Sequence, residues 1–230
     1  MDVRVDFDRD HPPVVYPPQK NDRSFNNTVS NARMKLQSRI PNTIYEFRPV
    51  ELVFETDTYI DVFGNKNNKT LSETLAHRRY AKLKQDAEDK YSKFLAEPLG
   101  EFLLALKISS DDFYQKFLNK YGDERYSRFR IVDPDIFNRR GVYTYTIGDE
   151  LMYVGRCRDS MRTRINQGYG TIHPKNCFID GQATNCHLNA LITTERDKIG
   201  FGFCELPVAD IVEVEKNLIT EYTPAWNIKL

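Results

Sequence analysis

The pattern of hydrophobic and polar residues divides the chain into segments, and the first of them is irregular. Residues 1–35 contain two Pro-Pro pairs and an Asn-rich stretch, which favour an irregular or extended arm. Residues 45–63 then carry short runs of β-branched and aromatic residues, YEF, ELVF and TYIDVF, which are typical of strands. The polar run GNKNNK interrupts this strand-like stretch.

A helical pattern begins at Thr70, which is placed to form a capping box with Glu73. A narrow apolar stripe continues it as one long polar helix until Pro98 breaks the pattern. A second helix is predicted directly after this proline, and a third over residues 111–121. We therefore expect residues 36–135 to form a mainly helical region with a few strands.

The pattern changes after Arg139, where two runs rich in tyrosine and β-branched residues flank a turn. GVYTYTIG and LMYVG predict a β-hairpin with Gly148 in its turn. Such a turn places Tyr143 opposite or next to opposite Tyr153, so both hydroxyls can project from one face. The elements predicted after the hairpin are two helices, a strand and a final helix, at about residues 160–167, 185–194, 199–206 and 207–223.

Composition and charge limit the partners of the chain. Its 230 residues are 40% hydrophobic and 12% aromatic, which is sufficient to form a core. The formal net charge is zero, so the whole molecule is not a generic binder of polyanions. Residues 125–164, however, contain nine arginines against five acids, which predicts a strip that binds DNA phosphates. The alternative is a solvated face with local ion pairs. The strip consists of Arg125, Arg128, Arg130, Arg139, Arg140, Arg156, Arg158, Arg162 and Arg164.

Membrane insertion and disulfide bonding are not expected. No run of about 18 apolar residues is present, and the N-terminal sequence lacks the apolar core of a signal peptide, so we expect a cytoplasmic protein. The four cysteines form no CxxC pair and are expected to be reduced thiols. A zinc site is not favoured, because paired ligands at a fixed spacing are missing. Its possible ligands would be His173, Cys177, Cys186 and His187.

A glutamate on the inner stripe of the last predicted helix is the most informative single residue. The apolar positions of this helix define a stripe that passes through Glu215. A carboxylate on a buried face is costly unless it is paired or bound to a cation. Glu215 therefore predicts either an ion site or an internal salt bridge.

Together these features resemble the GIY-YIG nuclease family. GVY at 141–143 and YVG at 153–155 match the two triads, and an arginine, a glutamate and an asparagine follow in the order of the family. The matching residues are Tyr143, Tyr153, Arg164 (with Arg162 as the second choice), Glu215 and Asn227. The resemblance covers only Gly141 to Asn227. It implies a small α+β domain over residues 136–230, with a central three-stranded, mostly antiparallel sheet flanked by helices.

The resemblance implies hydrolysis of phosphodiester bonds with one metal ion. Glu215 would hold Mg²⁺, with Mn²⁺ as a substitute, and Tyr143 would take the proton of the attacking water. An unperturbed tyrosine is a poor base at neutral pH, so positive charge from Arg164 or the metal would have to favour the phenolate. Tyr153 would position water or phosphate, and Asn227 would tie the tail to the site. The auxiliary candidates, for which a structural role is the alternative, are Arg156, Tyr169, His173 and His187.

The run GQATNCHLNALI is similar to the corresponding segment of GIY-YIG type II restriction endonucleases. We therefore expect a sequence-specific enzyme that cuts double-stranded DNA, in which residues 36–135 and the arginine strip grip the duplex. A palindromic site would imply a homodimer, because one catalytic centre cuts one strand. The alternatives are a DNA-repair or mobile-element nuclease and, in a different class, a catalytically inactive DNA-binding module.

Overall fold

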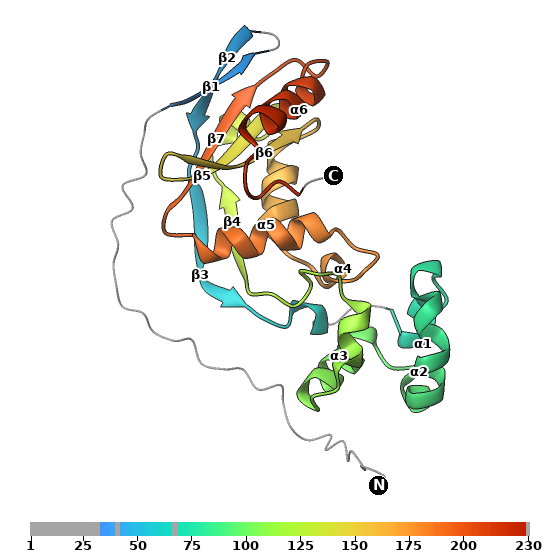
Figure 1. Ribbon diagram of the computed structural model, residues 1–230. Helices are drawn as coiled ribbons and strands as arrows, with labels where there is room; N and C mark the ends of the chain where they lie inside the picture. Colours follow the sequence, from blue (N-terminus) through green and yellow to red (C-terminus); the bar gives the residue numbers. More distant parts are fainter. Residues whose placement is uncertain (1–32, 40–41, 66–68, 229–230) are drawn as a thin grey trace.

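The computed structural model describes residues 33–39, 42–65 and 69–228 (Figure 1). Residues 1–32 of the predicted arm lie outside this part. The described chain has an α+β fold with a curled, half-barrel sheet of five antiparallel strands and a separate antiparallel pair. The large sheet has the order β1-β2-β7-β5-β6, and these strands span Met34–Arg39, Asn42–Pro49, Ile199–Glu205, Gly141–Ile147 and Glu150–Cys157. The pair consists of β3 (Leu52–Tyr59) and β4 (Tyr126–Ile131).

The expected three-stranded sheet is wrong, because two strands from the N-terminal part of the chain extend it. β7 pairs with β5 on one side and with β2 on the other, where Arg48 lies opposite Phe203 and Pro49 opposite Gly202. β1 pairs in turn with β2. The open edge of a strand carries unpaired backbone groups, and the pairing with β2 covers part of that edge of β7. Local patterns predicted strand character near β2 but did not say which strand it would join.

The expectation of a mainly helical region over residues 36–135 is also wrong. Four strands, β1 to β4, lie in it, and much of its helical part consists of 3₁₀ helices. The capping box of Thr70 and Glu73 is present and begins α1. The predicted long helix breaks at His77, whose extended backbone and side chain cap a new 3₁₀ helix. The segments between β3 and β4 are η1 Val62–Gly64, α1 Leu71–Leu75, η2 Arg78–Leu83, α2 Lys84–Tyr91, η3 Ser92–Phe94, α3 Leu99–Ile108 and η4 Asp112–Phe117.

Different helices cover the two faces of the large sheet. A π-helix (Thr163–Tyr169) and α5 (Ala183–Thr194) share a hydrophobic core with the tyrosines of β5 and β6. α6 (Ile211–Tyr222) packs on the opposite face, against alternate residues of the same strands such as Val142 and Val154. The alternation of side chains along each strand therefore sends tyrosines to one core and aliphatic residues to the other.

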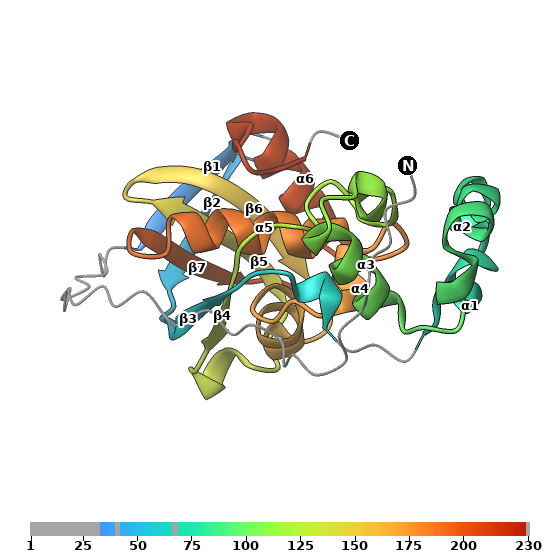
Figure 2. The ribbon, with the colours of Figure 1, turned by 90° about the horizontal axis from the view of Figure 1, so that it is seen from below.

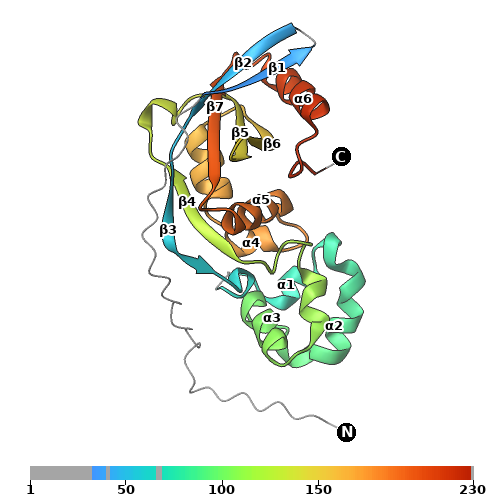
Figure 3. The same ribbon diagram turned by 60° about the vertical axis from the view of Figure 1, so that its left-hand side comes forward.

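A third core joins the short helices of residues 62–117 to α4 (Pro174–Cys177) and to the start of α5. Figures 2 and 3 show α1 to α3 gathered at one end of the molecule, away from β1 and β2. Among the described residues, no helix combines the length and the apolarity that a membrane crossing requires.

Candidate active site

The β5–β6 hairpin brings tyrosines to one face of the sheet. Tyr145 lies directly opposite Tyr153, and Tyr143 lies opposite Gly155. Tyr143 and Tyr153 are therefore diagonal neighbours, and their ring centroids are 6.2 Å apart. The prediction that both tyrosines lie on one face is confirmed, but the residue directly opposite Tyr153 is Tyr145 rather than Tyr143.

The glycines of both triads are required by close packing. A Cβ atom at Gly155 would lie 2.6 Å from the hydroxyl oxygen of Tyr143, so the tyrosine ring occupies the space above the glycine. A Cβ atom at Gly141 would lie 2.0 Å from the carbonyl oxygen of Cys204 on β7. Glycine is therefore required in both triads, because a side chain would collide with Tyr143 at one position and with the backbone of β7 at the other.

The π-helix places a further tyrosine beside the hairpin. Arg164 and Tyr169 are five residues apart, which is about one turn of a helix with i→i+5 hydrogen bonds. The hydroxyl of Tyr143 donates to that of Tyr169 over 3.0 Å, and the guanidinium carbon of Arg164 lies 5.9 Å from the Tyr169 ring centroid. Arg162, the second choice, instead lies over the ring of Phe137 at 5.4 Å. Among the auxiliary candidates, Tyr169 is therefore the one that contacts Tyr143.

Burial raises the pKa of both Tyr143 and Tyr153 and so favours their neutral forms. Tyr143 is fully buried, and loss of hydration raises its pKa well above the usual value, although Arg164 opposes this shift. Burial also raises the pKa of Tyr153, which at 8% exposure is the most accessible of Tyr143, Tyr153 and Tyr169. Tyr143 could act as a base only if nearby positive charge favoured its phenolate form, and Arg164 alone does not supply enough.

Glu215 projects from α6 to the edge of β6. Its side chain is only 14% exposed and pairs with Arg156, which directly follows the second triad. Burial raises the pKa of the Glu215 carboxyl, while Arg156 and Arg164 act in the opposite direction. Of the two interpretations left open by the sequence, the salt bridge is thus present in this structure, and its partner is Arg156.

The chain after α6 packs along the outer edge of β6. The side-chain oxygen of Asn227 accepts from the backbone N–H of Val154 over 3.0 Å, and its amide donates to the Val154 carbonyl over 2.8 Å. The Trp226 N–H donates to the Met152 carbonyl over 2.8 Å. Asn227 therefore imitates a neighbouring strand, and the tail is tied back beside Tyr153.

The two auxiliary histidines have different positions. His187 lies against Tyr121 with ring centroids 4.4 Å apart, and its Nε2 lies 3.1 Å from the carbonyl oxygen of Trp226, whose own N–H is bonded to β6. Burial lowers the pKa of His187. This histidine thus supports the tail. His173 is exposed at the start of α4 and lines a cleft.

The donor groups at Glu215 fit Mg²⁺ better than zinc. In the part of the chain that the structure describes, no group of three or more His, Cys, Asp or Glu side chains is placed to hold a metal ion, so the zinc set drawn from the sequence is not assembled. Mg²⁺ is commonly bound by one or two carboxylates together with water and substrate phosphates, whereas structural zinc requires four protein ligands. A carboxylate beside arginines that can bind phosphate fits the first pattern.

The nine arginines of the predicted strip fall into separate groups. Arg128 and Arg130 lie on the exposed face of β4, where Arg128 stacks over the Tyr59 ring at 4.5 Å. Arg125 donates to the Thr58 hydroxyl over 3.4 Å. Two others make local contacts, since Arg139 pairs with Glu205 at 3.1 Å and Arg140 donates to the Asp159 carbonyl over 3.3 Å. The strip is therefore not one continuous row, and its β4 members are displayed on a strand.

A cleft of about 580 Å³ opens beside Arg164. One wall is formed by the end of β6 and the π-helix, and the other by the segment from His173 to Asn185. Its basic residues include Arg158, Arg164 and Lys175. Lys175 was not predicted as part of a site, because it stands alone in a polar stretch, outside the arginine-rich interval.

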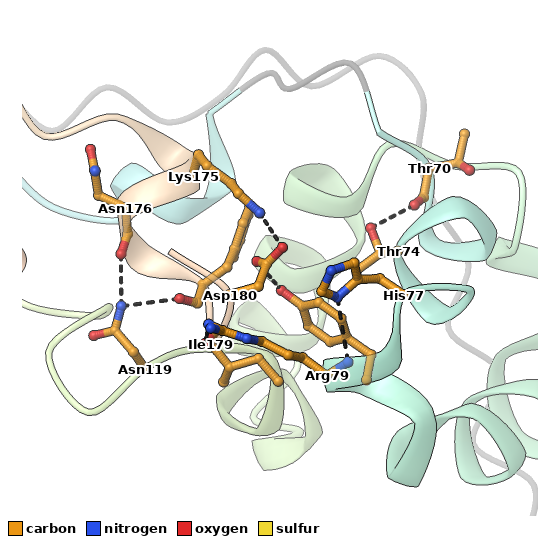
Figure 4. A network of polar contacts seen from close by, with 11 residues as sticks. Thr70, Thr74, His77, Arg79, Asn119, Lys175, Asn176, Ile179 and Asp180 are labelled. Atoms are coloured by element: carbon orange, nitrogen blue, oxygen red, sulfur yellow. Dashed lines mark hydrogen bonds and ion pairs between the residues drawn. The ribbon is translucent and has the colours of Figure 1, made fainter. Parts of the chain in front are cut away.

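A second polar cluster joins the short helices to the wall of this cleft (Figure 4). Asp180 accepts from the Tyr80 hydroxyl over 2.7 Å and pairs with Lys175. Arg79 donates to the Ile179 carbonyl over 2.9 Å. Burial alone would raise the pKa of Asp180, but its bonds to Lys175 and Tyr80 lower it. This cluster fixes the segment after α4 to η2.

Comparisons with protein-family models, with curated proteins and with solved structures gave no match for this chain.

Proposed function

We propose that the unit built on β5, β6 and α6 is a metal-dependent endonuclease that hydrolyses phosphodiester bonds in DNA. The observation that carries this proposal is the cluster of Tyr143, Tyr153 and Tyr169 beside Arg164, together with the largely buried carboxylate of Glu215 at the edge strand β6, whose charge acts on Tyr153. These residues come from two strands, a π-helix and α6. A tyrosine cluster alone would be ordinary core packing, but an arginine and a largely buried carboxylate beside it form a charged site.

We assign a role to each residue of the site from its exposure and charge. Arg164 is the cation that can neutralise charge growing on a phosphate, because a planar guanidinium binds two oxygens at once. Tyr153 is the more exposed of Tyr143 and Tyr153 and would orient the phosphate or the attacking water. Tyr143 lies behind it as a neutral phenol and holds the cluster through its bond to Tyr169. A role as proton acceptor requires more positive charge than Arg164 supplies.

Glu215 is the residue that would hold the divalent cation. When bound, Mg²⁺ supplies Lewis-acid stabilisation of the phosphate and of the leaving oxygen. Asn227 holds the tail against β6 and thereby fixes the C-terminal end of α6, the helix that carries Glu215 in its first half.

A sequence-specific restriction enzyme acting as a homodimer on a palindrome is the finer form of the proposal. It is supported by the similarity of the segment containing α5 to that of GIY-YIG restriction endonucleases, and by the exposed arginines of β4. A repair or mobile-element nuclease uses the same chemistry on other DNA structures. An inactive DNA-binding module would keep the arginines but not need the buried carboxylate.

The test is to incubate the protein with several plasmids and Mg²⁺ and to sequence the ends that are produced. Discrete fragments with a common end sequence are expected. Glu215→Gln purified in parallel is the control for contaminating nucleases. Cutting confined to flaps or lesions would replace the restriction assignment by repair, and equal cutting by the wild type and the Glu215→Gln variant would overturn the proposal itself.

A further inference from the structure

The ion pair between Arg156 and Glu215 bears directly on metal binding. Arg156 lies on β6, the edge strand of the large sheet, and its side chain is 43% exposed. Its Nη1 binds Oε2 of Glu215, whose carboxylate is largely buried. The carboxylate is thus paired with a cationic side chain that also has access to solvent.

A divalent cation and the Arg156 guanidinium compete for the same carboxylate. Among the described residues, no cluster of acids or histidines surrounds Glu215 to offer a cation alternative ligands. Two positive charges on one buried carboxylate repel each other, and the repulsion is strong where the local dielectric constant is low. Binding of a cation to Glu215 is therefore opposed for as long as Arg156 stays paired with it.

A phosphate group offers Arg156 a new partner. Guanidinium groups bind phosphate oxygens in a two-pronged geometry, and a cleft lined by Arg158, Arg164 and Lys175 opens at the end of β6, the strand that carries Arg156. If Arg156 turned to a phosphate without a cation present, the buried carboxylate would lose its partner, which is costly. Phosphate and cation binding should therefore favour each other.

We propose that Arg156 couples the two ligands of the site: it occupies Glu215 in the free protein, and transfer of its guanidinium to a DNA phosphate opens Glu215 to the divalent cation. The proposal rests on the proposed function of this site. It makes Arg156 a positioning residue that acts through Glu215, and it predicts that the free protein binds cations weakly.

The first experiment measures Mn²⁺ binding to the full-length protein without DNA, from the electron paramagnetic resonance signal of free Mn²⁺. Arg156→Gln should bind Mn²⁺ about fivefold more tightly than the wild type, which corresponds to about 1 kcal/mol for release of a partly exposed ion pair. Arg158→Gln is the matched control, because it removes the same charge two residues away and should change the affinity less. Glu215→Gln should remove the site.

The second experiment measures the affinity for a short DNA duplex with and without Ca²⁺, by fluorescence anisotropy. Coupling between two ligands is reciprocal, so Ca²⁺ should strengthen DNA binding more in the wild type than in Arg156→Gln. Equal Mn²⁺ affinities of the wild type and Arg156→Gln, or an equal gain in Arg158→Gln, would overturn the coupling while leaving the nuclease proposal intact. Mn²⁺ binding that is unchanged by Glu215→Gln in every background would overturn both.

Discussion

Two largely buried carboxylates, Asp180 and Glu215, lie in different electrostatic surroundings in two regions of the molecule. Asp180 is 9% exposed and lies between Lys175 and Tyr80, which together lower its pKa. Glu215 is 14% exposed and pairs with Arg156, yet burial raises its pKa. The surroundings of the first carboxylate favour its anionic form, whereas at the second the cost of burial outweighs the effect of Arg156.

The difference distinguishes a structural tie from a candidate ligand. Asp180 joins η2 to the segment after α4, and its charge is already compensated by the fold. Glu215 carries a charge whose burial Arg156 offsets only in part, so a cation would be favourable there once Arg156 has turned away. Burial of an acid is therefore less informative than the completeness of its pairing.

The largest expected effect comes from Glu215→Gln. Cleavage should fall by about a thousandfold or more, because the variant loses the group that would hold the cation and stabilise charge at the phosphate. The melting temperature should not fall, since the neutral amide avoids the cost of burying a charge. Single-turnover cleavage and thermal unfolding on one sample check both expectations. DNA binding in Ca²⁺ serves as the control for folding, and cleavage within tenfold of the wild type would remove Glu215 from the site.

Two tyrosine hydroxyls can be compared in the same way, that of Tyr143 in the candidate site and that of Tyr80, which binds Asp180. Tyr143→Phe loses the hydrogen bond to Tyr169 and should cost about 0.5 to 1.5 kcal/mol of stability. A fall in cleavage of about a hundredfold or more would show that this hydroxyl takes part in proton transfer. Tyr80→Phe should cost similar stability and leave cleavage by the folded protein nearly unchanged. Single-turnover rates and unfolding curves are the measurements. Cleavage by Tyr143→Phe within tenfold of the wild type would confine this tyrosine to packing.

Asp180→Asn tests whether the carboxylate of Asp180 stabilises the fold. The free energy of unfolding should fall by about 1 to 3 kcal/mol, because the buried bonds to Tyr80 and Lys175 are weakened. Denaturant unfolding measures this loss, and Asp149→Asn, an exposed turn residue, is the matched control. A variant as stable as the wild type would show that Asp180 does not hold the two segments together.

Replacing Arg128 and Arg130 by alanine tests binding without touching either carboxylate. The double variant should bind all DNA sequences more weakly, and the slope of log affinity against log salt should become shallower by about two, one for each lost phosphate contact. Anisotropy titrations at several salt concentrations measure the slope. An unchanged slope would show that the exposed face of β4 does not contact phosphates.

The smallest effect is the dependence of stability on pH, and it has opposite signs at the two carboxylates. The lowered pKa of Asp180 contributes stability above its unfolded-state pKa, and this contribution is lost as the pH falls through the folded-state value. The raised pKa of Glu215 makes its charge costly near neutral pH, and that cost disappears as the pH falls. Relative to the wild type, the deficit of Asp180→Asn should therefore shrink in acid, as should any advantage of Glu215→Gln. Melting curves from neutral to acidic pH test both signs.

Local patterns in the sequence were sufficient for several parts of the site. The alternation along the hairpin predicted that Tyr143 and Tyr153 share one face, and the helical stripe placed Glu215 on an inner face. The capping box at Thr70 was also predicted. Each of these depends on neighbours within a few residues or on one short turn, where backbone geometry fixes which side chains share a face.

Tertiary structure decided the rest, because it depends on contacts between distant residues. β2 joins β7 from a remote part of the sequence, so the five-stranded sheet could not be predicted from either segment alone. The π-helix brings Tyr169 to Tyr143, 26 residues away, through a wider helical turn that composition does not reveal. The partner of Glu215 lies 59 residues away on β6, and only the packing of α6 against that strand selects Arg156. Sequence patterns specify faces, whereas the choice of partner across the molecule depends on how those faces pack.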